Sequence, residues 1–218
     1  MNRKVIVTGI VTLLVVGLWS IAAPQPQDSR KGDMGEKLSQ PRIPPLARAE
    51  WTEEQRQVLE RYYTEGRMYN VQGTFAQHWE AYKKYLGWAT HVIGNTSTLP
   101  PRERELLILR TGWLCHAEYE WGQHVVMGKA AGLTDVEIAR IKDGPEVQGW
   151  GRFDATLLRA ADELHARAFV GDATWSALSE RYTTNQLMDA VFAVGQYTMV
   201  SMALNSFGVQ LDKGVKGF

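Results

Sequence analysis

The stretch Trp113-Leu-Cys-His-Ala-Glu-Tyr-Glu-Trp-Gly-Gln-His124 places many reactive side chains inside apolar, helix-forming sequence. It holds two histidines, two glutamates, two tryptophans and the single cysteine of the chain. Burying polar and ionisable groups is costly unless they are paired or take part in chemistry. The stretch therefore marks both the centre of the fold and the candidate functional site.

Working outward from this stretch, the sequence from Trp51 onward has the pattern of helices. A Ser or Thr followed three residues later by Glu or Gln forms a capping box, which typically opens a helix. Such boxes begin at Thr52, Thr74, Thr134 and Thr183. No segment of useful length alternates polar and apolar residues as a strand would. The sequence predicts an all-α fold, with one domain over residues 43–212.

The longest helical pattern begins at Pro101, because proline is tolerated in the first turn of a helix. It runs to Ala131, where Gly132 provides a stop. A break near Gly112 is the alternative, and it would divide the pattern into two helices.

If residues 105–124 form one helix, about 100° of rotation per residue places four polar side chains on one face. These are Glu105, His116, Glu120 and His124, whereas Cys115 points away from them. Glu120 and His124 lie one turn apart, so the carboxylate can raise the imidazole pKa and orient the ring for acid–base catalysis. A solvated polar face is the simpler alternative, but the apolar residues on both sides of the stretch disfavour it.

Other kinds of site have weaker support. A metal held by His116, Glu120 and His124 is a minority alternative, and we expect no metal and no cofactor. The single Cys115 excludes an intrachain disulfide and a multi-cysteine zinc site, and a lone cysteine is commonly a buried structural residue. Lys plus Arg and Asp plus Glu both number 24, so the chain has no net charge that would draw it to nucleic acid.

The N-terminus indicates export. Residues 1–22 combine a short positive start with an uncharged apolar run, which is typical of a signal peptide. The run is long enough that an uncleaved anchor is the alternative, and only then would the chain contact a membrane. Residues 23–42 are polar and rich in proline, so we interpret them as a linker or arm, and residues 213–218 as a tail. We expect a periplasmic or secreted protein.

Residues 99–141, LPPRERELLILRTGWLCHAEYEWGQHVVMGKAAGLTDVEIARI, resemble the carboxymuconolactone decarboxylase and alkylhydroperoxidase D-like (AhpD-like) family. A looser resemblance extends from Ile43 to Asp212. The resemblance implies an AhpD-like orthogonal helical bundle that assembles as homotrimers or homohexamers, with active sites near subunit interfaces.

The peroxidase branch of this family uses a glutamate, a Cys-x-x-Cys pair and a histidine. By this resemblance the glutamate and histidine fall on Glu105 and His124, while the two cysteine positions fall on Ala117 and Glu120. Disulfide-based peroxidase chemistry is therefore disfavoured. The decarboxylase branch, which uses acid–base residues around the histidine, fits this sequence better.

These observations lead to one main hypothesis and two alternatives. The main one is a decarboxylase-like enzyme that acts on a small lactone- or carbonyl-containing organic acid. In it His124 moves the proton, and Glu120 and Glu105 orient the imidazole. His116 and Tyr197 are expected to contact the substrate. Trp113 and Trp121 are expected to form apolar walls of its pocket. The alternatives are an AhpD-like peroxidase that relies on Cys115 and a non-enzymatic helical ligand-binding oligomer.

Overall fold

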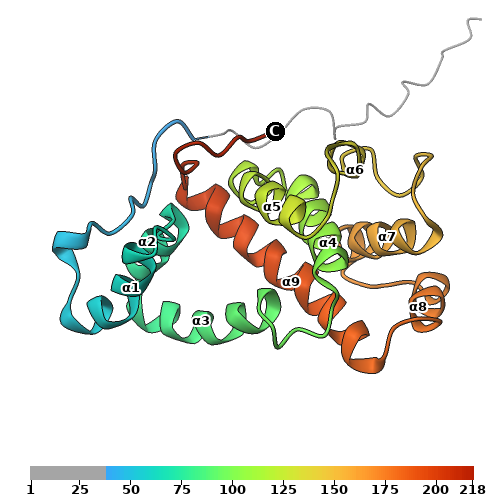
Figure 1. Ribbon diagram of the computed structural model, residues 1–218, viewed down its shortest axis with the longest axis horizontal. Helices are drawn as coiled ribbons and strands as arrows, with labels where there is room; N and C mark the ends of the chain where they lie inside the picture. The colour runs from blue at the N-terminus through green and yellow to red at the C-terminus, as the bar shows by residue number, and fades with distance from the viewer. Residues whose placement is uncertain (1–37) are drawn as a thin grey trace, which may run out of the picture. The chain divides into compact units, whose positions relative to one another are not determined.

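The computed structural model describes residues 38–218. This part of the chain forms α-helices and a short 3-10 helix, and none of its residues forms a strand, which confirms the all-α prediction (Figure 1). The elements are η2 (Arg48–Glu50), α1 (Glu53–Thr64), α2 (Asn70–Ala76), α3 (Trp79–Ile93), α4 (Pro101–Leu114), α5 (Glu118–Ala130), α6 (Asp135–Ile141), α7 (Arg152–Arg167), α8 (Asp172–Ser179) and α9 (Thr184–Phe207). The predicted signal peptide or anchor, and the linker up to residue 37, lie outside the described residues.

Helix α4 forms the centre of the core. Every residue from Glu103 to Gly112 is buried, because α5, α7 and α9 pack around it. A helix that is enclosed on all sides needs no polar face, which explains the apolar run Leu106–Leu109. It also means that the charged residues of α4 are held inside the protein, where each of them requires a partner.

Helix α9 crosses the described part of the chain between α1–α3 and α4–α8 (Figure 1). Its 24 residues are long and apolar enough, by length and composition alone, to cross a membrane. Of its most apolar 18-residue window, 56% is buried within the fold. Burial in a core accounts for most of this apolar character.

Most predicted helix starts are confirmed, and one is wrong. Capping boxes open three helices as expected, at Thr52, Thr134 and Thr183. The predicted start at Thr74 is wrong, because this residue lies buried inside α2. Helix α3 begins later, where the Nδ1 atom of His78 accepts a hydrogen bond from the Ala81 backbone N–H.

The long helical pattern from Pro101 to Ala131 forms two helices, and the break comes three residues after Gly112. Helix α4 ends in a Schellman motif, in which Ala117 N–H bonds Gly112 O at 2.9 Å and His116 N–H bonds Trp113 O at 3.0 Å. His116 occupies the left-handed position of this motif, with φ of 50°. Glycine usually fills that position. Because histidine stands there instead, the sequence pattern does not mark the end of α4.

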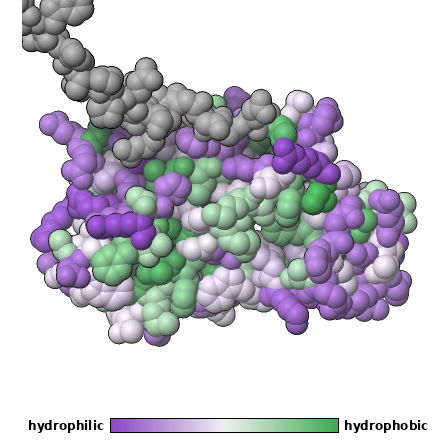
Figure 2. Space-filling view, turned by 180° about the vertical axis from the view of Figure 1, so that it is seen from behind, coloured by the Kyte–Doolittle hydropathy of each residue, from purple (hydrophilic) through white to green (hydrophobic). Residues whose placement is uncertain are grey.

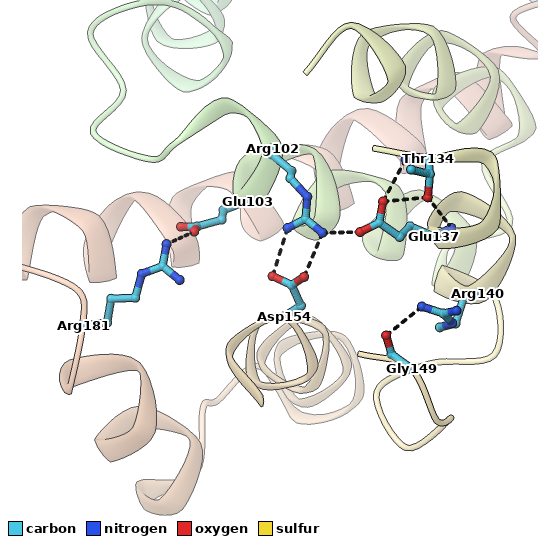
Figure 3. A network of polar contacts seen from close by, with 8 residues as sticks. All are labelled: Arg102, Glu103, Thr134, Glu137, Arg140, Gly149, Asp154 and Arg181. Carbon is cyan, nitrogen blue, oxygen red and sulfur yellow. Dashed lines mark hydrogen bonds and ion pairs between the residues drawn. The ribbon is translucent and has the colours of Figure 1, made fainter. Parts of the chain in front are cut away.

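The first turn of α4 is fixed by a network of charged side chains (Figure 3). Arg102 donates from Nη1 and Nη2 to both carboxylate oxygens of Asp154 on α7, at 3.1 and 2.8 Å, and from Nη2 to Glu137 on α6 at 2.5 Å. Burial alone would raise the pKa of Glu137, but bonds from Thr134 and Arg102 hold it below its ordinary value. Arg181, just after α8, pairs with Glu103 beside this network. The network therefore fixes where α4 enters the core.

We expect replacement of Arg102 by methionine to lower the free energy of unfolding by about 1–3 kcal/mol, because it removes the partner of the partly buried Asp154 carboxylate and of one Glu137 oxygen. Urea denaturation near neutral pH measures the loss. Arg152→Met is the matched control, since the Arg152 and Glu180 side chains are 80% and 60% exposed. The control is expected to cost less than about 0.5 kcal/mol. Equal losses in the two variants would contradict a structural role for the network.

Apolar side chains are also exposed to solvent. Figure 2 shows hydrophobic residues gathered across the middle of one face, with hydrophilic residues around them. Three exposed methionines lie on α9, at positions 188, 199 and 202. A surface of this kind is typical of a protein with an interaction partner.

Candidate active site

The candidate site is built by the α4–α5 hairpin. Glu105 lies in the first turns of α4, and His124 lies in the middle of α5. On one continuous helix these residues would be about 28 Å apart, so a shared helix face could not bring their side chains into contact. The turn at Cys115–Ala117 folds α5 back along α4 and brings Glu105 to His124. The structure brings these predicted residues together, but through a hairpin and not through one continuous helix face.

His124 is held between two carboxylates. Its Nδ1 lies 2.6 Å from Glu105 Oε2, and its Nε2 lies 2.8 Å from Glu120 Oε1. The exposed fractions of Glu105, Glu120 and His124 are 1%, 5% and 4%. The structure therefore brings together the three side chains that the sequence predicted as catalytic, and it removes them almost completely from solvent.

The carboxylates determine the charge of the imidazole. Burial by itself would lower the pKa of His124, but the charges and hydrogen bonds of Glu105 and Glu120 raise it to about 10. Both ring nitrogens therefore carry protons at neutral pH and face carboxylate oxygens. The imidazolium has no free lone pair with which to accept a proton in this arrangement.

Helix α9 closes the site. The Tyr197 ring meets the His124 ring edge to face, with centroids 4.7 Å apart. Burial and the nearby Glu120 charge raise the pKa of the Tyr197 hydroxyl well above its ordinary value, so it stays protonated. Tyr85 of α3 lies near Glu120 and interacts with the Gln196 amide. Tyr197 was predicted as a substrate contact, whereas Tyr85 was missed because it reads as one more aromatic residue of α3.

Arg104 is the second residue that sequence reasoning missed. Its side chain is 10% exposed, and its Nε lies 3.7 Å from Glu105 Oε1. Its Nη1 donates to Gly94 O, at the end of α3, at 3.3 Å. The available signal was the charged pair Arg104-Glu105 directly before four consecutive apolar residues, because both side chains then have to be buried together.

The two tryptophans lie away from His124. Their rings contact each other, with centroids 5.7 Å apart, and both pack against Phe218 near the end of the tail. The Lys142 ammonium lies 5.0 Å from the centroid of each. Trp113 and Trp121 therefore form an aromatic cluster with the tail and Lys142 at the end of α6, and Trp113 also lines the cavity beside the α4–α5 turn.

His116 and Cys115 also lie outside the triad. His116 is exposed in the turn between α4 and α5. The sulfur of Cys115 lies 3.7 Å from His165 Nδ1. Burial raises the pKa of the Cys115 thiol, and the charge of Glu120 raises it further, while hydrogen bonds with the Ser201 and Thr198 hydroxyls lower it without reversing the shift. A raised pKa favours the unreactive thiol over the nucleophilic thiolate.

A cavity of about 840 Å³ opens beside this turn. It lies among the α4–α5 turn, the end of α9 and the tail, and its lining includes Trp113, Cys115, His116 and Tyr119. Glu105, Glu120 and His124 are not part of the lining. In the described conformation the triad is closed, and the cavity is a separate feature.

Within residues 38–218, no group of three or more His, Cys, Asp or Glu side chains is placed to share a metal ion. The geometry of the triad gives the reason. The two carboxylates lie at opposite nitrogens of one imidazole, so they do not converge on a common point.

Comparison with known proteins gives the same fold. The crystal structure of a peroxidase-related protein with an alkylhydroperoxidase AhpD core, from Ralstonia eutropha JMP134, matches with a TM-score of 0.69 and 16% identity over 78% of this chain and 93% of that one. A peroxidase-related protein from Silicibacter sp. TM1040 matches with a TM-score of 0.68 and 16% identity over 82% and 93%. A variant of the debrominase Bmp8, in complex with 2,3,4-tribromopyrrole, matches with a TM-score of 0.65 and 9% identity over 78% and 91%.

Sequence comparison gives a family match over part of the chain. No curated protein matches the chain significantly. Residues 74–163 match the carboxymuconolactone decarboxylase family, and this range contains Glu105, Glu120 and His124 but not Tyr197. Residues 74–163 are therefore similar to the carboxymuconolactone decarboxylase family, and the described residues share the AhpD-like helical fold of the solved structures.

Proposed function

We propose that this protein is an enzyme that uses acid–base chemistry on a small lactone- or carbonyl-containing organic acid, as a decarboxylase-like enzyme would. The observation that carries the proposal is the triad, in which one buried imidazole lies between two buried carboxylates. A helical scaffold has no need for three ionisable groups in its core, and perturbed titratable groups gather at catalytic sites. The non-enzymatic alternative leaves the triad unexplained.

The geometry favours Glu120, rather than His124, as the residue that exchanges a proton with substrate. Both nitrogens of His124 are occupied, so it acts best as a fixed positive charge. Among the described residues only His124 forms an ion pair with Glu120, and it does so through Oε1, so we assign the other carboxylate oxygen to the substrate. His124 then stabilises the carboxylate, and Glu105 holds the ring in place.

The reaction class follows from this arrangement. A carboxylate base beside a protonated imidazole suits removal of a proton next to a carbonyl, or its return to carbon after loss of CO₂. The protonated Tyr197 hydroxyl and the imidazolium both favour the negative charge that develops on an enolate oxygen. A closed site keeps water away from such an intermediate.

The test is a screen of lactone and 2-oxo or 3-oxo carboxylic acids against the purified full chain. We expect turnover with at least one member, detected as CO₂ release or as deuterium exchange from D₂O at the carbon next to the carbonyl. The proposal fails if every compound that is turned over reacts equally with the wild type and the Glu120→Gln and His124→Gln variants.

The peroxidase alternative relies on Cys115, and its raised thiol pKa opposes it. We expect iodoacetamide to alkylate Cys115 in the native protein at neutral pH at least about tenfold more slowly than in the unfolded protein. Mass spectrometry measures both rates on one sample, so the unfolded chain is its own control. Native alkylation as fast as that of the unfolded chain would restore the peroxidase alternative.

We also propose that the protein assembles with itself through α9. Exposed or partly exposed residues repeat along this helix with steps of four and three, which is the spacing of a coiled-coil seam. They are Met188, Phe192, Gly195, Met199 and Met202. Gly195 lies midway along the seam, and a Cβ added there would meet no atom within 4 Å.

The seam suits antiparallel pairing around Gly195. A twofold axis there would place Met188 opposite Met202 of a second copy, and the glycine would let the two helices approach closely. A hexamer with twofold contacts contains such pairs, whereas a simple trimer does not. We therefore favour an even-numbered homo-oligomer over the trimer.

We expect replacement of Met199, which is 45% exposed, by lysine to shift the protein to a smaller species in size-exclusion chromatography with light scattering. A charge in an apolar seam is costly to bury, so we expect association to weaken at least about tenfold. Val136→Lys is the matched control, because Val136 is an exposed apolar residue on α6 outside the seam. If Met199→Lys keeps the wild-type mass, α9 is not the interface.

A further inference from the structure

Two buried polar atoms beside the triad face each other without a hydrogen-bond partner among the described residues. They are Arg104 Nε, a donor, and Glu105 Oε1, an acceptor. Their separation of 3.7 Å is too long for a direct hydrogen bond. It is short enough for one small group to contact both. Buried polar atoms left unpaired in this way require an explanation, because each costs about 1–3 kcal/mol.

We infer that Arg104 and Glu105 form a binding site for a single uncharged oxygen that both accepts and donates a hydrogen bond, as in water or a substrate hydroxyl. Such an oxygen accepts from Arg104 Nε–H and donates to Glu105 Oε1. It thereby satisfies both atoms at once. Only the meaning of this site in catalysis rests on the proposed function.

The hydrogen-bond requirement excludes other groups. A carbonyl or ether oxygen accepts from Arg104 but leaves Glu105 Oε1 unpaired. An ammonium group donates to Glu105 but meets the positive guanidinium. A carboxylate or phosphate would face the Glu105 carboxylate at close range, which is unfavourable in a buried site.

The ionisable side chains around this site also disfavour a charged ligand. Arg104 lies 3.7 Å from Glu105, and His124 lies between Glu105 and Glu120. These buried side chains already face one another, so a charged ligand would add a buried charge without a partner of its own. The carboxyl group of an organic acid substrate is therefore expected to bind elsewhere, while a hydroxyl of that substrate can occupy this site.

The site lies next to the reacting groups. The oxygen would bond the same carboxylate that holds His124 Nδ1 at 2.6 Å, and Tyr197 packs on that imidazole. The bound oxygen would thus help to fix the position of Glu105 and, through Glu105, that of the imidazolium. Arg104 is in this view a positioning residue, since it acts through the bound oxygen and Glu105.

The test is crystallographic and does not depend on activity. Crystals of the full chain are soaked separately in methanol, which both donates and accepts, and in acetonitrile, which only accepts. We expect an ordered oxygen within hydrogen-bonding distance of both Arg104 Nε and Glu105 Oε1. Its replacement by the methanol oxygen identifies a hydroxyl site, and water that persists in both soaks identifies a water site.

Either of two results from these crystals would overturn the inference. One is a direct bond between Arg104 Nε and Glu105 Oε1 with no third atom between them. The other is an acetonitrile nitrogen in the site, which would remove the need for a donor. The Arg104→Met variant is a further check, because its structure is expected to lack the ordered oxygen. An oxygen that remains beside Glu105 in this variant would also contradict the inference. Failure of the proposed function would leave these results unchanged.

Discussion

Replacement of Glu120 by glutamine is expected to lower kcat/KM by about 10²–10⁴-fold, which is the usual contribution of a general acid or base. Glutamine keeps the size of the side chain and can still contact His124, so the fold is expected to remain. It cannot take up the proton that the carboxylate accepts. The measurement is steady-state kinetics on the substrate that the screen identifies, with circular dichroism to check folding.

The matched control is Glu118→Gln, the same chemical change two residues earlier on α5. Glu118 lines the separate cavity beside the turn, so we expect its variant to keep activity within about twofold of the wild type. His124→Gln is expected to fall as steeply as Glu120→Gln, because the two groups act as a unit and such effects do not add. Wild-type turnover by Glu120→Gln would show that Glu120 is not the proton-exchanging residue.

The sequence identified the helices well because helix starts depend on local chemistry. The boxes at Thr52 and Thr183 work within four residues, and tertiary contacts do not override them. Thr74 failed because its hydroxyl is used elsewhere, at 3.5 Å from the Ile43 carbonyl. A capping sequence can therefore occur inside a helix when tertiary packing uses the side chain.

The sequence could indicate candidate residues of the site but not their arrangement in space. Density of ionisable groups in an apolar run was enough to select Glu105, Glu120 and His124. Their arrangement depended on a turn with histidine at a position that glycine usually fills, and no local pattern revealed it. Tyr85 reaches the site from α3, so only tertiary structure could add it, whereas the charged pair Arg104-Glu105 before the apolar run was a sequence signal for Arg104.

The raised pKa of His124 makes a second large effect testable. The folded pKa of about 10 exceeds the unfolded value of about 6.5. The stabilisation from this group is therefore complete below about pH 6.5 and is lost as pH rises towards about 10. We expect the free energy of unfolding to fall across this window, by at most about 1.4 kcal/mol per pH unit from this group.

Replacement of Glu105 by glutamine is expected to flatten this slope. The variant removes one of the two charges that raise the imidazole pKa, so the folded and unfolded values move closer together and less proton binding is linked to folding. Urea denaturation at a series of pH values between 6 and 10 measures the slope in the wild type and the variant. Glu118→Gln again is the control and is expected to retain the wild-type slope. If the wild type and Glu105→Gln show equal slopes, the imidazole is not held as a cation by Glu105. Its role as a fixed positive charge beside Glu120 would then have to be abandoned, even if both residues prove essential for turnover.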